Sequence, residues 1–167
     1  TQEFGQDEPV MIISSDKDFI QLQKFKNVKQ FAPMQKKLVK DDNPRTYLFN
    51  HIMRGDAGDG IPNILSADDT FVSEGKQTPL RQTRIDDWME KADNLRDCME
   101  ETVFRNYQRN KKLIDLAEIP EDIQESIINN FNSQSIAPRL KVLNYLIKIE
   151  YEGTNFVGWQ SQKNGKS

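Results

Sequence analysis

Apolar runs near the start of the chain predict a small β-sheet. Residues 9–13, Pro-Val-Met-Ile-Ile, form a continuous apolar run, which is typical of a parallel strand buried on both faces. Two further apolar stretches, over residues 28–31 and 38–39, flank Ala32-Pro33-Met34 and predict a hairpin of two short strands. A short helix is expected between the first strand and this hairpin.

Helical spacing of the apolar residues dominates from residue 45 onward. Helices are predicted over residues 45–54, 85–110, 120–132 and from Pro138 onward. The first follows Asn43-Pro44 and is expected to end at Gly55, since proline suits the first helical turn and glycine suits the position after the last. Residues 55–63 are rich in glycine and predict a turn, and residues 66–84 predict a mobile loop. Strands followed by helices indicate an α/β chain.

Composition narrows the class of protein. The chain has 167 residues, of which 36% are hydrophobic and 29% charged, enough for one domain or slightly more. It contains no apolar run long enough to predict a membrane span. The single cysteine, Cys98, cannot form an internal disulfide, which favours a reducing cytoplasm. With His51 as the single histidine, zinc-finger patterns are excluded.

Positive charge is concentrated near the start of the chain, although the net charge is −3. Residues 17–40 contain seven lysines and one acid, Asp18. Such a basic stripe on an acidic protein suits a surface that follows a phosphate backbone. The alternative is a solvated lysine-rich face without a ligand. The seven are Lys17, Lys24, Lys26, Lys29, Lys36, Lys37 and Lys40.

A first acidic pair, Asp16 and Asp18, follows the predicted strand. Side chains at i and i+2 of an extended segment point to the same side, so both carboxylates can converge at the carboxyl end of the strand, where α/β sheets bind ligands. A divalent cation such as Mg²⁺ relieves the repulsion between two converging carboxylates. The alternative is that Asp18 caps the following helix while Asp16 lies in solvent, and the spacing alone leaves both open.

A second acidic pair, Asp56 and Asp59, lies in the glycine-rich turn. A spacing of three places both on one side of a helical turn, and the neighbouring glycines allow close approach of a ligand or positive φ angles. Taken alone, the segment also fits an ordinary turn. Together the two pairs supply four carboxylates, which fits a two-metal site for phosphodiester hydrolysis with Mg²⁺, or alternatively Mn²⁺. His51 is interpreted as a surface or partly buried helix residue rather than a ligand or base.

Two segments resemble signatures of one enzyme family. Residues 12–22, Ile-Ile-Ser-Ser-Asp-Lys-Asp-Phe-Ile-Gln-Leu, closely resemble the flap endonuclease or 5′-nuclease family. Residues 55–63, Gly-Asp-Ala-Gly-Asp-Gly-Ile-Pro-Asn, match the second signature of the same family, in order. The lysine-rich segments 27–30 and 33–37 look like the ribonuclease H of T-even-type bacteriophages, a branch of this family. The resemblance covers about residues 8–148.

The resemblance implies a fold and a domain order. Residues 1–44 would be the carboxyl part of a parallel-sheet 5′-nuclease (PIN-like) domain with a lysine-rich hairpin. Residues 45–148 would form a mostly α-helical DNA-binding subdomain, with a helix-hairpin-helix-like module over residues 45–70. Residues 149–167 look foreign to the family and are expected to be poorly packed, since residues 145–163 resemble the start of a TruA-type tRNA pseudouridine synthase.

The resemblance also implies a metal-dependent 5′→3′ exonuclease and flap endonuclease that removes RNA primers and adjacent DNA in replication. Asp16 and Asp18 would be catalytic metal ligands, and Asp56 and Asp59 would contribute to the second metal site. The substrates would be DNA and RNA–DNA duplexes with 5′ ends or flaps. A single-stranded-DNA-binding protein or sliding clamp would be a partner of this monomer. The expected nucleic-acid contacts are Lys17, Lys24, Lys36, Lys37, Gly55, Gly58, Gly60, Arg81 and Arg84.

The same resemblance predicts that the chain is the carboxyl half of a nuclease. The family uses further carboxylates and an arch from segments that would precede Thr1, so we expect the isolated chain to be an inactive fragment. The alternative function is a non-catalytic module that binds duplex DNA or a replication partner through its helices. The two hypotheses differ in whether the aspartates bind a divalent ion.

Overall fold

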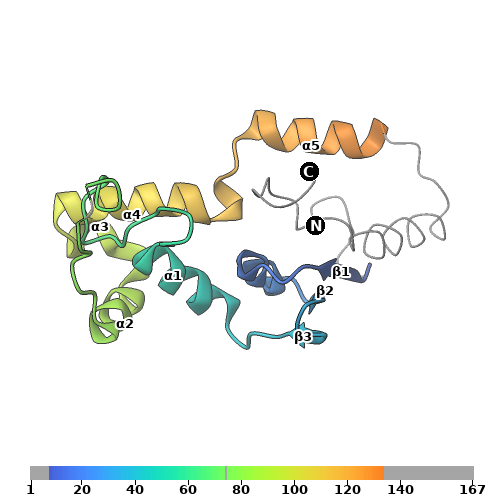
Figure 1. Cartoon of the computed structure of the whole chain (residues 1–167), viewed down its shortest axis with the longest axis horizontal. Coiled ribbons are helices and arrows are strands. Elements are labelled where there is room, and N and C mark those ends of the chain that lie inside the picture. Colours follow the sequence, from blue (N-terminus) through green and yellow to red (C-terminus); the bar gives the residue numbers. More distant parts are fainter. Residues whose placement is uncertain (1–7, 74, 134–167) are drawn as a thin grey trace, which may run out of the picture. The chain divides into compact units, whose positions relative to one another are not determined.

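The computed structural model describes residues 8–73 and 75–133, and the chain divides into two compact units, residues 1–119 and 120–167 (Figure 1). The first unit contains a small sheet and several helices, whereas the described part of the second is one helix. The mixed α/β class expected from the sequence is confirmed. The helix expected from Pro138 and the tail 149–167 lie outside the described residues.

The sheet has three strands in the order β1-β2-β3. Strand β1 (Val10–Ile13) runs parallel to β2 (Val28–Ala32), and β2 pairs antiparallel with β3 (Lys37–Val39). The predicted hairpin is therefore confirmed. A parallel neighbour for β1 requires a crossover, which a 3-10 helix, η1 (Lys17–Lys24), provides.

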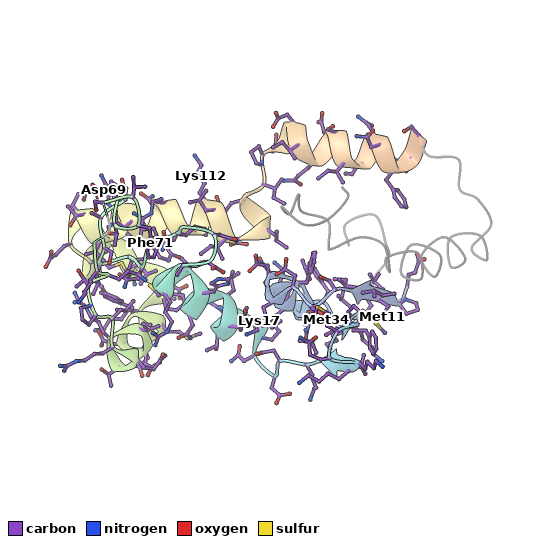
Figure 2. All side chains as sticks on the ribbon, in the orientation of Figure 1. Met11, Lys17, Met34, Asp69, Phe71 and Lys112 are labelled. Carbon is purple, nitrogen blue, oxygen red and sulfur yellow. The ribbon has the colours of Figure 1, made fainter. Side chains whose placement is uncertain are left out.

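The prediction that β1 is buried on both faces is wrong for the described residues. Met11 and Ile13 are 51% and 59% exposed, whereas Val10 and Ile12 are half-buried. Figure 2 labels Met11 at this edge of the sheet, together with exposed Met34 in the hairpin turn. The physical reason is that β1 is an edge strand, and nothing within residues 8–73 and 75–133 covers its outer face.

Four helices of the first unit pack around one apolar core. They are α1 (Pro44–Arg54), α2 (Gln82–Glu90), α3 (Leu95–Cys98) and α4 (Glu101–Ile114). Short 3-10 turns, η2 (Ala92–Asn94) and η3 (Leu116–Glu118), lie between α2 and α3 and after α4. As predicted, α1 follows Pro44 and ends at Gly55, with the Asn43 side chain accepting a hydrogen bond from the Thr46 amide.

The single helix predicted over residues 85–110 is wrong, because the chain bends twice within it. Helix α2 ends before Lys91, and the backbone is extended at Met99 and Glu100 before α4 begins. After these bends Trp88, Leu95 and Met99 all lie in the same core. Tertiary burial therefore overrides the continuous helical pattern.

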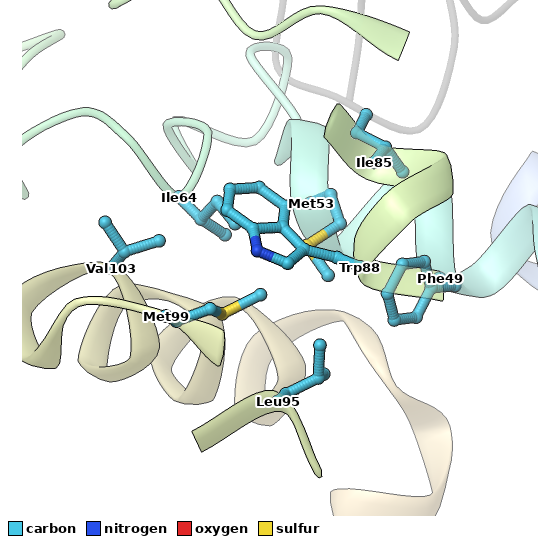
Figure 3. Close-up of a cluster of buried hydrophobic side chains, with 8 residues drawn as sticks. All are labelled: Phe49, Met53, Ile64, Ile85, Trp88, Leu95, Met99 and Val103. Carbon is cyan, nitrogen blue, oxygen red and sulfur yellow. The ribbon is translucent and has the colours of Figure 1, made fainter. Parts of the chain in front are cut away.

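Eight buried apolar side chains form the core of the first unit (Figure 3). Met53, Ile64 and Ile85 are fully buried, and Trp88 is 3% exposed. Burial of each large apolar side chain contributes about 1.5–3 kcal/mol to folding. The set is Phe49, Met53, Ile64, Ile85, Trp88, Leu95, Met99 and Val103. Because Phe49 and Met53 belong to α1, the core fixes the carboxyl end of that helix.

One buried asparagine of α4, Asn106, holds the segment that follows the glycine-rich turn. Asn106 Nδ2 donates to the carbonyl oxygens of Ile64 and Ser66, at 3.0 and 3.1 Å. Ser66 and Thr70 are buried. The predicted loop over 66–84 is irregular up to Gln82, where α2 begins, and its start is packed rather than solvated.

The second unit contains α5 (Glu121–Ser133), close to the predicted span. No residue of α5 is buried, and its apolar side chains Ile123, Ile127 and Phe131 are each about half exposed. Among the residues that the structure describes, no helix has the length and apolar character needed to cross a membrane.

Candidate metal centre

Both acidic segments meet at one histidine. His51, in the last turn of α1, has Nδ1 3.4 Å from Asp18 Oδ1 and Nε2 3.1 Å from Asp56 Oδ2. The His51 side chain is 15% exposed, whereas Asp18 and Asp56 are 37% and 35% exposed. One potential ligand atom from each residue lies within 4.8 Å of the others. The chain thus brings two carboxylates and an imidazole from distant segments into one cluster.

Asp18 is positioned by a turn rather than by a strand. Strand β1 ends at Ile13, and Asp16 Oδ1 accepts a hydrogen bond from the Asp18 backbone amide at 3.0 Å. Asp16 therefore caps η1, and the alternative in which Asp18 is the cap is wrong. Buried Gln30 of β2 fixes this turn, since its Nε2 donates to the carbonyl oxygens of Ser14 and Asp16 at 2.9 and 2.6 Å.

Asp56 is positioned by the turn that ends α1. Gly55 has φ of 68°, and a Cβ at this position would lie 2.3 Å from the Ile61 carbonyl oxygen. This close approach lets the Ile61 amide donate to the Asp56 carbonyl oxygen at 2.7 Å. Asp56 Oδ1 accepts from the amides of Gly58 and Asp59, at 2.8 and 3.3 Å. Its other oxygen, Oδ2, is left to face His51.

The four predicted aspartates share one electrostatic environment. Partial burial raises the pKa of Asp18, His51 opposes this shift, and the charges of Asp16, Asp56 and Asp59 raise that pKa further. Asp16 and Asp59 are themselves exposed. The structure thus brings Asp18 and Asp56 together beside His51, at the junction of η1, α1 and the glycine-rich turn, and Asp16 and Asp59 are near enough for their charges to act on Asp18.

Asp56 behaves differently from Asp18. Partial burial alone would raise the pKa of Asp56, but hydrogen bonds from His51, Gly58 and Asp59 outweigh it and hold that pKa below its usual range. A carboxylate that accepts several hydrogen bonds is stabilised in its charged form. The cluster therefore contains one acid whose charged form is destabilised, Asp18, and one whose charged form is stabilised by hydrogen bonds, Asp56.

The sequence predicts that His51 is a surface or partly buried helix residue, and it does not predict the contacts of His51 with Asp18 and Asp56. Its burial is as predicted for a partly buried helix residue, but its two neighbours are acids. A histidine one turn before Gly55-Asp56 was a local signal, since the end of α1 leads directly into the acidic turn. The contact with Asp18 has no local signal, because it depends on the packing of α1 against η1.

The imidazole is held by its surroundings. The Tyr47 ring, four residues earlier on α1, meets the His51 ring edge-on with centroids 5.9 Å apart. Burial and the nearby charge of Asp18 raise the pKa of Tyr47, so its hydroxyl stays neutral. At the backbone, the Gly55 amide donates to the His51 carbonyl oxygen at 2.8 Å, which closes the last turn of α1.

Among the predicted nucleic-acid contacts, the lysines are exposed, whereas Arg84 is stacked on an aromatic ring. All seven lysines between residues 17 and 40 are exposed, and in residues 8–73 and 75–133 only Lys40 among them forms an ion pair, with Asp42 at 2.7 Å. Lys17, labelled in Figure 2, lies between Asp16 and Asp18 in sequence. Arg84 lies on α2 rather than in the predicted loop, and its guanidinium stacks 4.6 Å from the Trp88 ring.

The glycine-rich turn is followed by further turns and not directly by a second helix. Gly60 has a positive φ of 76°, like Gly55. Helix α1 and the glycine-rich turn match the first part of the expected helix-hairpin-helix-like module over residues 45–70. Residues 64–73 form turns, and the next helix begins at Gln82. The module is therefore not confirmed.

The donor set fits a divalent cation. Carboxylate oxygens suit Mg²⁺ and Mn²⁺, and an imidazole nitrogen extends the choice to transition metals. Asp16 and Asp59 do not belong to this group of three ligand atoms, but their negative charges act on Asp18.

Known proteins are similar to this chain over most of its length. Residues 43–154 match the family described as T4 RNase H, C terminal. Ribonuclease H of Enterobacteria phage T4 is 35% identical over 147 residues, which cover 83% of this chain and 47% of the relative. The chain therefore spans about half of the length of this curated relative. The family match continues to residue 154, into the segment that resembles a pseudouridine synthase.

Proposed function

The chain belongs to the T4 ribonuclease H family, of which it carries the carboxyl half, and from this premise we propose that it supplies part of the metal centre of a 5′ nuclease. The nuclease would be a metal-dependent 5′→3′ exonuclease and flap endonuclease. Its proposed task is the removal of RNA primers and adjacent DNA during replication.

The observation that carries the proposal is the convergence of Asp18 and Asp56 on His51. The two acids come from different signatures of the family, and an imidazole 3.4 and 3.1 Å away separates them. Like charges gathered this closely are costly unless a cation offsets them. Partial burial and neighbouring charges already raise the pKa of Asp18. We therefore propose that Asp18 and Asp56 hold the ion directly and that Asp16 and Asp59 support it with their negative charge.

Each aspartate would have a distinct part in this work. Asp18 and Asp56 present one oxygen each toward the space beside His51, and Asp16 fixes Asp18 by capping η1. Asp59 adds negative charge at the exposed rim. When bound, Mg²⁺ or Mn²⁺ would polarise the phosphodiester and favour ionisation of the attacking water.

The lysine-rich surface would guide the nucleic acid to this centre. Exposed lysines that form no ion pair within residues 8–73 and 75–133 can contact phosphates. Lys17, Lys24, Lys36 and Lys37 are the proposed contacts, with backbone approach at Gly55, Gly58 and Gly60. Arg81 is a further candidate, whereas Arg84 would have to leave its position over Trp88. The proposed substrates are duplexes with 5′ ends or flaps, and a single-stranded-DNA-binding protein or sliding clamp is a proposed partner.

We also propose that the isolated monomer binds divalent ions but does not cleave. The centre is open, since Asp16 and Asp59 are exposed and the other two aspartates are about one-third exposed. Two-metal hydrolysis needs a dry, shaped site with a fixed coordination sphere. Mg²⁺-dependent cleavage of a 5′ flap that Asp16→Ala abolishes would overturn this part of the proposal.

A second candidate, a binding module without catalysis, is favoured by one observation. Asp16 does cap η1, as a purely structural aspartate would. This candidate does not explain why Asp18 faces His51 rather than solvent. Calorimetric titration with Mg²⁺ separates the two: the nuclease proposal predicts binding that Asp59→Asn weakens, with exposed Asp93→Asn as the matched control. An absence of binding would favour the module.

A further inference from the structure

One buried side chain, Gln21, attaches the 3-10 helix η1 to the end of α4. Gln21 is 3% exposed. Its Nε2 donates to the Ile114 carbonyl oxygen at 3.0 Å, and its Oε1 accepts from the Leu116 amide at 2.9 Å. Ile114 is the last residue of α4 and Leu116 is the first of η3, so neither group has a partner within its own helix. The Gln21 side chain therefore supplies the hydrogen bonds that these two helix ends lack.

The same row of η1 carries Asp18. Side chains three residues apart in a 3-10 helix lie one above the other, and Asp18 comes three residues before Gln21. Asp18 Oδ1 lies 3.4 Å from His51 Nδ1 on α1. One turn of η1 thus presents Asp18 to α1, while the next turn is attached to α4. Any rotation or sliding of η1 that moved Asp18 would break the hydrogen bonds of Gln21.

Helix α4 also holds the segment that carries the other acid of the cluster. The Asn110 side chain donates to the carbonyl oxygens of Ile52 and Pro62, which lie before and after Asp56 in sequence. Asn110 and Ile114 are about one helical turn apart on α4 and are both buried. The last turn of α4 therefore holds both segments that supply an acid to the cluster.

We propose that Gln21 is a positioning residue of the metal centre, which sets the place of Asp18 relative to Asp56 by attaching η1 to the end of α4. The inference rests on the proposed metal centre and adds a residue outside the cluster on which ion binding depends. Among side chains of this length, glutamine offers both a donor and an acceptor, whereas ionised glutamate only accepts and methionine offers no donor. Precise placement of ligands by such supporting hydrogen bonds is what a metal site requires.

Calorimetric titration of the full chain with Mn²⁺ tests this inference from the far side of the contact. Leu116→Pro removes the amide that donates to Gln21 and leaves η1 unchanged. Proline suits this position, because Leu116 opens η3 and Asp115 before it is already extended, with φ of −77° and ψ of 113°. Leu116→Ala is the matched control, since it also shortens the side chain but keeps the amide. Leu116→Pro should weaken Mn²⁺ binding by about 10-fold, the lower end of the effect of supporting groups at a metal site, and Leu116→Ala should leave it unchanged.

A second arm changes Gln21 itself. Gln21→Met removes both hydrogen bonds at similar side-chain length and should weaken Mn²⁺ binding at least as much as Leu116→Pro. Val103→Ala, in the apolar core of the helices, lowers stability by a different route and should leave the affinity unchanged while the chain is folded. In an Asp18→Asn background, Gln21→Met should cause little further loss, because its effect is exerted through Asp18.

The outcomes separate this inference from the proposal beneath it. Mn²⁺ affinity that is unchanged in Leu116→Pro and Gln21→Met would overturn the role of Gln21 and leave the metal centre standing. Equal losses in Leu116→Pro and Leu116→Ala would also overturn it, and this pair decides the question even where Gln21→Met fails to fold. A wild-type chain that binds no divalent ion would contradict both.

Discussion

The side-chain amide of Asn110 donates to the carbonyl oxygens of Ile52 and Pro62, each at 2.9 Å. Asn110 is fully buried on α4. One acceptor directly follows His51 in sequence and the other lies near the end of the glycine-rich turn, so a single amide connects the two segments that place His51 and Asp56. The geometry of the candidate centre therefore depends on a residue that does not touch it.

Asn110→Ala should destabilise the fold by about 1–3 kcal/mol, because it removes the Asn110 donor from the buried Ile52 carbonyl oxygen, whereas Arg109 Nη2 still donates to the Pro62 carbonyl oxygen at 3.0 Å. Chemical denaturation measures the change in the free energy of unfolding. The control is Lys112→Ala on the same helix, which is exposed (Figure 2) and should have little effect. Equal stability of the two variants would show that the Asn110 bridge is unimportant.

Gly55→Ala and Gly60→Ala should differ, although both residues have positive φ angles of 68° and 76°. A Cβ at Gly60 would meet no atom within 4 Å. Gly60→Ala should therefore lower the free energy of unfolding by about 1–2 kcal/mol, the cost of a left-handed alanine. At Gly55 the Cβ would also clash with the Ile61 carbonyl oxygen, which adds about 1–3 kcal/mol or more. Thermal and chemical unfolding of the pair check this. A similar loss at both positions would contradict the close approach at Gly55.

Asp18→Asn and Asp56→Asn should shift the stability of the metal-free chain in opposite directions. Burial and neighbouring charges raise the pKa of Asp18, so the folded state binds this proton more tightly than the unfolded state does, and stability falls as pH rises through that pKa. At neutral pH Asp18→Asn should therefore raise the melting temperature.

The pKa of Asp56 is lowered, because hydrogen bonds outweigh burial. The contribution of ionised Asp56 to the stability of the fold is present above the ordinary pKa of aspartate, and it is lost as the pH falls through the lowered pKa. Asp56→Asn should therefore lower the melting temperature at neutral pH, and the difference should shrink in acid. Melting curves of both variants across the acid range test the two signs, and shifts of the same sign would contradict this account.

Affinity for duplex DNA should depend on the exposed lysines. Lys36→Ala combined with Lys37→Ala should weaken binding and reduce the slope of log affinity against log salt by about 0.9 for each phosphate contact removed. Lys40→Ala is the control, since Lys40 already pairs with Asp42. Fluorescence anisotropy at several salt concentrations gives both quantities. If Lys40→Ala reduced the slope as much as the double variant does, the lysines would act through their summed positive charge and not through individual phosphate contacts.

Local signals in the sequence predicted the elements that local forces determine. The hairpin, the span of α1 between Pro44 and Gly55, and α5 follow from short-range patterns and caps. The break at Met99 could not be predicted, because it arises from burial in a core shared with Trp88. For the same reason, the exposed face of β1 depends on which elements cover the sheet.

The candidate site divides in the same way. The four aspartates could be grouped from their two motifs, but the side chain that joins them could not. Contact between His51 and Asp18 requires α1 to pack against η1, and the cap at Asp16 rather than Asp18 follows from the end of β1 at Ile13. Motifs thus indicated the chemistry, and tertiary packing determined its arrangement.

The central claim is that Asp18 and Asp56 bind one shared centre. A double-mutant cycle tests it most directly: Mn²⁺ affinity is measured by calorimetry for the wild type, Asp18→Asn, Asp56→Asn and the double variant, with Asp93→Asn as control. We predict that each single change weakens binding about 10-fold or more and that the double variant loses clearly less than the product of the two, as expected for coupled residues. Losses that multiply independently, or no loss in either single variant, would contradict a shared centre.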